Sequence, residues 1–244
     1  MTRFRNPLFC AIDTPDIAHA RDLVRAVKPH AGGIKLGLEF FSAHGPAGVE
    51  SLSAEGLPVF IDLKLHDIPN TVCGAARALM RLNPAVLTVH VSGGEAMMRS
   101  VRDAVENEAD RLGVAEPWLV GVTVLTSLDA GDLDALGIEG STHRVVARLA
   151  KLAEKAGLDG VVCAPHEIST TRSTTRPSFR LVVPGIRPRG SDADDQKRVL
   201  TPAEAVGAGA DIIVVGRPVA RADDPGAAAR AIAKSIAGVD RPTD

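Results

Sequence analysis

The chain has 244 residues, a length that suits one large α/β domain or two small ones. Hydrophobic residues make up 45% and charged residues 24%, a balance that excludes global disorder. Because 28 basic residues nearly balance 30 acidic ones, the charge indicates neither a nucleic-acid-binding surface nor a membrane surface, and we expect a small-molecule partner.

Eight short apolar runs, rich in Val, Ile and Leu, alternate along the chain with helical patterns and are predicted to be strands. In chain order they are LFCAID (8–13), GIKLG (33–37), VFIDLKL (59–65), VLTVHVS (86–92), LVGVTVL (119–125), GVVCA (160–164), RLVVPG (180–185) and DIIVVG (211–216). From Asp13 to Gly216 the chain advances 203 residues over seven intervals, about 29 each, which is the size of one βα repeat.

The segments between these runs show the apolar spacing and the capping residues of helices. Apolar residues recur on one helix face at Ile17, Ala20, Val24 and Val27, and again at Val146, Leu149, Ala153 and Ala156. Thr201, Pro202 and Glu204 supply an N-cap, an N1 proline and an N3 glutamate, and Gly157 suits a helix end. Eight repeats predict a (β/α)8 TIM barrel in the α/β class, as a single domain over residues 1–244. The alternative is a doubly wound open sheet, although no GxGxxG follows the first run, and GAGAD (207–211) is predicted to be a tight helix-to-strand turn.

Several composition features narrow the location and the chemistry. The three cysteines are far apart and form no CxxC, which argues against a disulfide framework or a zinc site and favours a reducing cytoplasm. The apolar run from Leu8 to Ile12 is too short for a signal-peptide core, and no stretch approaches the roughly 20 apolar residues of a membrane span, so we expect a cytoplasmic protein. Tyrosine is absent, so a tyrosine acid or base is excluded and aromatic platforms for bases are scarce.

Charged residues gather at the carboxyl ends of the first three predicted strands, where a barrel carries its chemistry. Asp13 ends the first run, Lys35 lies in the second, and Asp62 and Lys64 lie in the third. Because strand side chains alternate between faces, Asp62 and Lys64 are predicted to point into the barrel and their apolar neighbours toward the helices. Buried ions must be paired, so we expect an alternating network of these four residues. A salt-bridge seal of the barrel mouth is the structural alternative, but apolar residues would seal it with less desolvation, which favours a site.

The segment DLKLHDIPNT (62–71), with its Asp-x-Lys-x-x-Asp-Ile-x-x-Thr pattern, resembles the signature of the orotidine 5'-phosphate decarboxylase family. Six further blocks resemble the family in the expected order: AID (11–13), IKLG (34–37), LTS (125–127), PGIRP (184–188), Gln196 and VVGRP (214–218). The likeness spans nearly the whole chain and is to the monofunctional bacterial type. It implies a homodimeric barrel that converts orotidine 5'-phosphate to UMP and carbon dioxide in pyrimidine synthesis, with no metal and no organic cofactor.

The resemblance implies roles for the charged residues. Lys64 would protonate the carbanion left on the pyrimidine ring, and Asp62 would lie against the substrate carboxylate and orient Lys64. Lys35 and Asp13 would bind ribose hydroxyls and complete the network. Asp67 and Thr71 would reach into the partner subunit's site. For Asp67 the alternative is a helix N-terminal charge beside Pro69.

The phosphate and the base have their own predicted residues. Barrels often bind phosphate in the loops after strands seven and eight, which here carry Arg187, Gly216 and Arg217; the alternative for Arg217 is an ordinary surface arginine. The loop IRPRGSDADDQKR (186–198) resembles the family's lid, in which Gln196 would bridge phosphate and base. Thr126 and Ser127 match the loop that hydrogen-bonds the pyrimidine amide edge.

Two histidines near the charged residues are also considered as site residues. His90 has no HxxxH partner and is predicted either to support the site or to be a hydrogen-bonded core histidine. His66 lies between Lys64 and Asp67, where the ammonium group of Lys64 disfavours binding of a metal ion.

Two alternative functions remain. Phosphosugar lyases share the Asp-x-Lys-x-x-Asp block but hold magnesium partly through a glutamate on the second strand, where this chain has Lys35. A non-catalytic phosphate sensor would need Gly216 and Arg217 but not Lys64.

Overall fold

Eight parallel strands close into a barrel in the computed structural model, which describes residues 3–188 and 200–240. The strands are β1 (Leu8–Ala11), β2 (Gly33–Gly37), β3 (Val59–Leu65), β4 (Val86–His90), β5 (Trp118–Val122), β6 (Gly160–Val162), β7 (Arg180–Val183) and β8 (Ile212–Val215). Each pairs with the next in sequence, and β8 pairs with β1 through the register Phe9↔Val214. The predicted (β/α)8 barrel is therefore confirmed and the open sheet is excluded.

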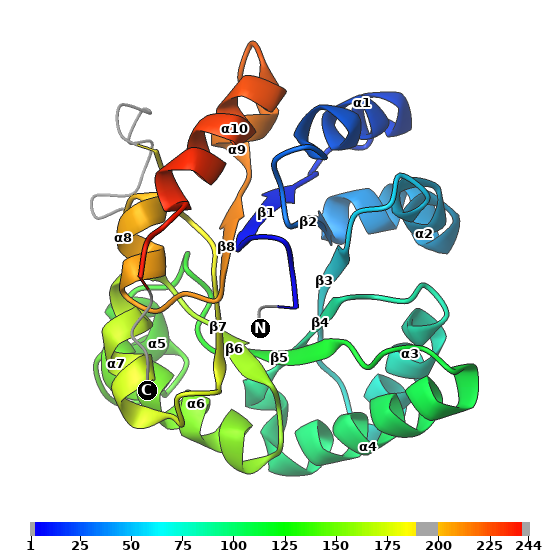
Figure 1. Ribbon diagram of the computed structural model, residues 1–244. Helices are drawn as coiled ribbons and strands as arrows, with labels where there is room; N and C mark the ends of the chain where they lie inside the picture. The colour runs from blue at the N-terminus through cyan, green and yellow to red at the C-terminus, as the bar shows by residue number, and fades with distance from the viewer. Residues whose placement is uncertain (1–2, 189–199, 241–244) are drawn as a thin grey trace.

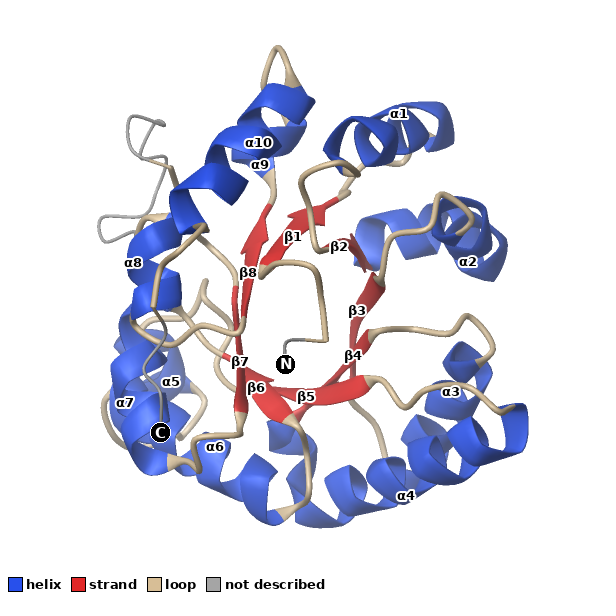
Figure 2. Cartoon of the chain, viewed as in Figure 1, coloured by secondary structure: helices blue, strands red, loops and turns tan. Residues whose placement is uncertain are grey.

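Helices form a ring outside the strands, as Figures 1 and 2 show in the view along the barrel axis. They are α1 (Ile17–Val27), α2 (Leu38–Ser53), α3 (Pro69–Met80), α4 (Gly94–Leu112), α5 (Ala130–Ala135), α6 (Thr142–Lys155), α7 (Ile168–Thr174), α8 (Pro202–Gly207), α9 (Arg217–Ala220) and α10 (Pro225–Ile236), with short 3-10 turns η1 (Val91–Gly93) and η2 (Pro165–Glu167). The predicted capping box at Thr201 is present, since its hydroxyl accepts from the amide of Glu204. GAGAD forms the predicted turn between α8 and β8.

Six of the eight strands end earlier than the sequence pattern predicts. The first run was predicted to reach Asp13, but β1 ends at Ala11, and the fourth was predicted to reach Ser92, but β4 ends at His90. The apolar pattern continues because Ile12, Val91 and Val124 lie just beyond their strands and remain almost fully buried. Asp13 therefore lies in a loop just past the strand, which leaves its side chain nearly half exposed.

The barrel has two apolar cores on opposite sides of its wall. The larger one lies between strands and helices, and the smaller one fills the interior with side chains that include Phe9, Phe60 and Val182. At the N-terminal end of the strands the ring of Phe4 meets Phe9 and Trp118 edge to face, with centroids 5.0 and 4.8 Å apart. The chain's N-terminal segment lies inside the ring of strands in Figure 2. Aromatic side chains therefore close this end of the barrel and leave the opposite end for polar chemistry.

A buried carboxylate fixes the turn before β8. Asp211 accepts hydrogen bonds from Arg172 at 2.9 Å, from Arg180 at 3.0 Å and from the amide of Leu181 at 2.9 Å. These contacts tie α7 and β7 to the start of β8 at the N-terminal end of the barrel. Across the described ranges, no helix is both long enough and apolar enough to pass through a membrane.

Candidate active site

Four charged side chains of alternating sign meet at the C-terminal ends of β1, β2 and β3. Nζ of Lys35 lies 3.2 Å from Oδ1 of Asp13 and 3.7 Å from Oδ2 of Asp62, and Nζ of Lys64 lies 2.8 Å from that same Asp62 oxygen. The side chains of Asp62 and Lys35 are only 11% and 12% exposed. A Cβ on Gly37 would approach both Asp13 and Lys35 to 3.0 Å, so the glycine leaves room for their ion pair. The structure thus brings together the predicted network.

The backbone at Lys64 departs from a regular strand. Its φ is 52°, in the left-handed region that residues other than glycine rarely occupy, and the β3–β4 pairing shifts register between Ile61 and Leu65. Simple alternation places Asp62 inside the barrel, two residues after the interior Phe60. Simple alternation does not account for the position of Lys64, because the backbone there is irregular; its side chain nevertheless contacts Asp62. The two charges were correctly predicted to lie together, but the irregularity was not predicted.

Thr88 of β4 belongs to this site and was not singled out by the sequence. Its side chain is fully buried, its hydroxyl donates to Oδ1 of Asp62 at 3.1 Å, and its oxygen accepts from the amide of Lys64 at 2.9 Å. The available signal was a polar residue at an inward-facing position of an otherwise apolar strand. Thr88 thus contacts both charged residues of β3.

The segment after β3 presents polar and apolar groups to solvent. Asp67 and Thr71 are exposed, and Ile68 between them is 66% exposed. Oδ1 of Asp67 accepts from the amide of Ile68, which precedes Pro69 at the start of α3. This contact fits the helix-terminus alternative for Asp67 within one chain. Among the described residues, the ion pairs of the charge network join Asp13, Lys35, Asp62 and Lys64 and do not include Asp67 or Thr71 of the same subunit.

The predicted phosphate residues lie at the C-terminal ends of the last two strands. Arg187 follows β7 and donates to the carbonyl of Ile186, and Gly216 follows β8 and precedes exposed Arg217, the first residue of α9. A Cβ on Gly216 would make only ordinary contact, 3.5 Å from Cβ of Ala11, and its φ is −103°. Packing within the chain therefore does not require glycine there.

The remaining predicted contacts to substrate come from the loop after β5 and from the loop after β7. Thr126 and Ser127 are exposed and follow Leu125, which is 37% exposed. Gln196 lies outside the described residues, so its predicted contact with phosphate and base stays a prediction.

Two histidines pack beside Lys64. The ring centroids of His66 and His90 are 5.2 Å apart, and partial burial together with nearby His66 and the Lys64 ammonium lowers the pKa of His90. Nδ1 of His90 is buried and has no hydrogen-bond partner among the described residues, so the prediction of a hydrogen-bonded core histidine is wrong for that atom. Within residues 3–188 and 200–240, no three His, Cys, Asp or Glu side chains gather as metal ligands would.

Glu167 is a buried acid that the sequence pattern did not mark. It is 2% exposed in η2, after β6, and one oxygen accepts from the amide of Ala164 at 2.7 Å. Burial raises the pKa of Glu167 to about 7, against a smaller lowering by the Ala164 hydrogen bond. His166 Nε2 lies 3.7 Å from the other oxygen. The segment APHEI (164–168) has the composition of a polar loop, so its sequence gives no indication that Glu167 is buried.

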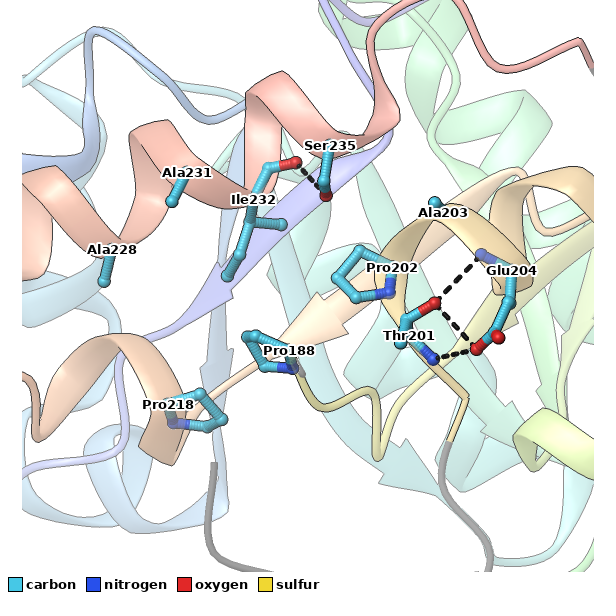
Figure 3. A pocket seen from close by; sticks show the side chains of 10 residues that line it. All are labelled: Pro188, Thr201, Pro202, Ala203, Glu204, Pro218, Ala228, Ala231, Ile232 and Ser235. Carbon is cyan, nitrogen blue, oxygen red and sulfur yellow. Dashed lines mark hydrogen bonds between the residues drawn. The ribbon is translucent and has the colours of Figure 1, made fainter. Parts of the chain in front are cut away.

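A cavity of about 550 Å³ lies between α8, α9 and α10, next to the predicted phosphate loops (Figure 3). Pro188 and Pro218, which directly follow Arg187 and Arg217, both line it, and Ile232 points into it from α10. The other lining residues are Thr201, Pro202, Ala203, Glu204, Ala228, Ala231 and Ser235. Its lining is mainly apolar and includes no member of the charge network, so it is separate from the charged site.

Comparison with known proteins agrees with this geometry. The family model described as "Orotidine 5'-phosphate decarboxylase / HUMPS family" matches residues 6–232. An orotidine 5'-phosphate decarboxylase from Paramagnetospirillum magneticum is 52% identical over 224 residues, 92% of this chain and 95% of the relative, and one from Moorella thermoacetica is 52% identical over 233 residues, 95% and 92%. The crystal structure of orotidine 5'-phosphate decarboxylase from Lactobacillus acidophilus superposes with a TM-score of 0.85 at 34% identity, covering 96% of this chain and all of that one. The chain belongs to the orotidine 5'-phosphate decarboxylase / HUMPS family.

Proposed function

We propose that this chain decarboxylates orotidine 5'-phosphate to UMP and carbon dioxide, the last step of de novo UMP synthesis, without a metal or an organic cofactor. Membership of the family and relatives near 50% identity support the substrate. One observation carries the chemistry: the ammonium of Lys64 lies 2.8 Å from the carboxylate of Asp62 at the open end of the barrel.

Lys64 acts as the proton donor. When the bond between the pyrimidine carbon and the carboxylate breaks, its electron pair stays on the ring carbon and carbon dioxide leaves. An ammonium beside that carbon stabilises the developing negative charge and then transfers a proton to it, which gives UMP. Lys64 recovers the proton from water. Its side chain is 29% exposed, so solvent has access for this step.

Asp62, Lys35 and Asp13 complete the site around Lys64. Asp62 orients the ammonium and faces the substrate carboxylate, so repulsion between the two carboxylates disappears as carbon dioxide departs. Lys35 lies between Asp13 and Asp62 and offsets their negative charge. Asp13, whose side chain is 46% exposed, and Lys35 bind the ribose hydroxyls.

The two ends of the nucleotide bind away from the reacting carbon. Arg187, Arg217 and the backbone around Gly216 bind the phosphate; because Gly216 has no side chain, an anion can approach that backbone closely. Thr126 and Ser127, both exposed after β5, hydrogen-bond the amide edge of the pyrimidine. Phosphate binding then contributes energy to catalysis at a distant carbon.

The working form is a homodimer in which Asp67 and Thr71 reach the partner's site. Two observations support this arrangement. Both residues are exposed in the single chain, and the apolar residue Ile68 between them is 66% exposed. The exposure of all three residues leaves the start of α3 accessible to a second chain.

Lys35 distinguishes this proposal from a magnesium-dependent lyase. A divalent cation between Asp13 and Asp62 would have to occupy the space where the Lys35 ammonium already lies, at 3.2 and 3.7 Å from their oxygens. Two like charges so close together would repel strongly in a site with limited solvent access. The residues present therefore support chemistry driven by ammonium groups.

The test is an assay of EDTA-treated protein with orotidine 5'-phosphate, followed by the change in ultraviolet absorbance. We expect conversion to UMP to survive EDTA and to collapse in Lys64→Ala. Failure of the folded wild-type protein to consume the substrate would refute the activity. Loss of activity with EDTA and its return with magnesium would instead support the lyase chemistry.

A further inference from the structure

A single buried hydroxyl joins the two charged residues of β3. Thr88 is 0% exposed, and its Oγ1 donates to Oδ1 of Asp62 at 3.1 Å while it accepts from the backbone amide of Lys64 at 2.9 Å. A threonine hydroxyl has one proton to donate, and that proton is committed to Asp62. Both hydrogen bonds therefore end on the same short segment of β3.

That segment holds an unfavourable backbone conformation. Lys64 has φ of 52°, and the pairing between β3 and β4 loses its regular register from Ile61 to Leu65. A left-handed conformation at a side-chain-bearing residue persists only where its surroundings hold it, and a bulge redirects the side chain that it carries. The Thr88 oxygen receives the Lys64 amide at this irregular position.

The same hydroxyl also determines how the Asp62 carboxylate is oriented. Oδ2 of Asp62 faces the ammonium groups of Lys64 and Lys35, and Oδ1 faces Thr88. With one oxygen held on each side, rotation of the carboxylate about its last torsion is restricted. The direction of the Lys64 ammonium is thus set from its own backbone and from its carboxylate partner at once.

We propose that Thr88 is a positioning residue for the decarboxylation, holding the Lys64 backbone and the Asp62 carboxylate so that the Lys64 ammonium meets the reacting carbon. This inference rests on the proposed function. Thr88 acts through Lys64 and Asp62, and it lies on β4, which is separated by other strands from β7 and β8, after which Arg187, Gly216 and Arg217 follow. Loss of its hydroxyl therefore lowers turnover more than substrate binding, because small misplacement of a reacting group is costly.

Paired substitutions separate the hydroxyl from the shape of the side chain. Thr88→Val keeps the branched shape and removes both hydrogen bonds, whereas Thr88→Ser keeps the hydroxyl and removes the methyl group. We expect Thr88→Val to lower kcat about 10- to 100-fold, the effect of losing a hydrogen bond to a charged group, with KM within about two-fold of wild type. Thr88→Ser should restore most of kcat.

Matched controls guard against a general loss of folding. Thr171→Val makes the same change at an equally buried threonine in α7 and should leave kcat unchanged. Circular dichroism and thermal unfolding check each variant. If Thr88→Val does not fold, Thr88→Ala and Thr88→Ser, which both lack the methyl group, isolate the hydroxyl, and serine should turn over about 10-fold faster or more.

The outcomes distinguish this inference from the proposed function. Wild-type protein that leaves orotidine 5'-phosphate intact contradicts the proposed function itself. Active wild-type protein with an unchanged kcat in folded Thr88→Val overturns the role of Thr88 alone. Equal losses in the valine and serine variants, or in serine and alanine, overturn it as well, because keeping the hydroxyl would then not preserve turnover.

Discussion

Nζ of Lys64 lies 2.8 Å from Oδ2 of Asp62, although both residues belong to the same strand. Lys35 approaches that oxygen from the neighbouring strand at 3.7 Å, so two ammonium groups share one carboxylate oxygen. Charges with limited solvent access depend on their partners for stabilisation, and removal of one leaves the others uncompensated. Each member of this network is therefore expected to affect the position and charge of the rest.

Lys35→Met tests the shared network. The substitution keeps an unbranched side chain but removes the cation between Asp13 and Asp62, so negative charge at the site is no longer offset. We expect kcat/KM for orotidine 5'-phosphate to fall by about 100-fold or more, the range seen when one preorganised electrostatic group is removed. Lys151→Met in α6, which removes an exposed lysine outside the network, should leave kcat/KM unchanged. Near-normal kcat/KM in Lys35→Met would contradict the network's role.

Arg217→Ala tests the phosphate end. Loss of its guanidinium removes a charge-assisted contact with the phosphate, and we expect kcat/KM for orotidine 5'-phosphate to fall by about 100-fold. Orotidine, which has no phosphate, serves as the matched substrate and should be turned over equally by the variant and the wild type. Arg221→Ala, at the exposed C-terminal end of α9, is the control variant. Equal losses with both substrates would place Arg217 outside the phosphate site.

The shared dimer site can be tested by mixing two inactive variants. If Asp67 acts in the partner's site, a hybrid of Lys64→Ala and Asp67→Ala subunits carries one site with both residues intact and one with neither. Mixing under subunit exchange should therefore restore activity to about a quarter of wild type, since half of the dimers are hybrids at equal mixing and each has one intact site. Each variant incubated alone is the control. Continued inactivity after exchange is demonstrated by mass-tagged subunits would count against Asp67 acting across the interface.

Glu167 predicts a specific dependence of stability on pH. Burial raises the pKa of Glu167 from 4.5 to about 7, so the folded state holds this proton more tightly than the unfolded chain does. The resulting stabilisation is complete below pH 4.5 and is lost as pH rises through about 7. Relative to Glu167→Gln, whose amide oxygen can still accept from Ala164, the wild-type free energy of unfolding should fall by at most about 3 kcal/mol across this window. Urea unfolding at pH values on either side measures it, and parallel pH profiles for the two proteins would refute it.

The sequence predicted the barrel well because one physical rule governs all eight repeats. Parallel strands covered on both faces require apolar runs, and the helices require an apolar stripe. The strand ends were less predictable, because Ile12 and Val91, which lie just beyond their strands, are as buried as residues within them. Burial alone therefore does not mark where the hydrogen-bonded ladder stops.

The candidate site was predictable where it depends on alternation. Alternation predicted that Asp62 faces inward, and Phe60, two residues earlier on the same strand, lies in the interior core. The left-handed backbone at Lys64 had no sequence signal, because no glycine or asparagine marks it. The roles of Thr88 and Glu167 depend on contacts between β3 and β4 and on burial of a loop, which a local pattern does not reveal.

Trp118 is the only tryptophan, and the chain contains no tyrosine. Its ring packs against Phe4 at the N-terminal end of the strands, with the length of the barrel between it and Lys64. Intrinsic fluorescence is consequently a one-residue signal from the end of the barrel opposite the candidate active site. Unfolding of any active-site variant can be followed through this indole, while ultraviolet absorbance of the nucleotide independently records turnover at the other end.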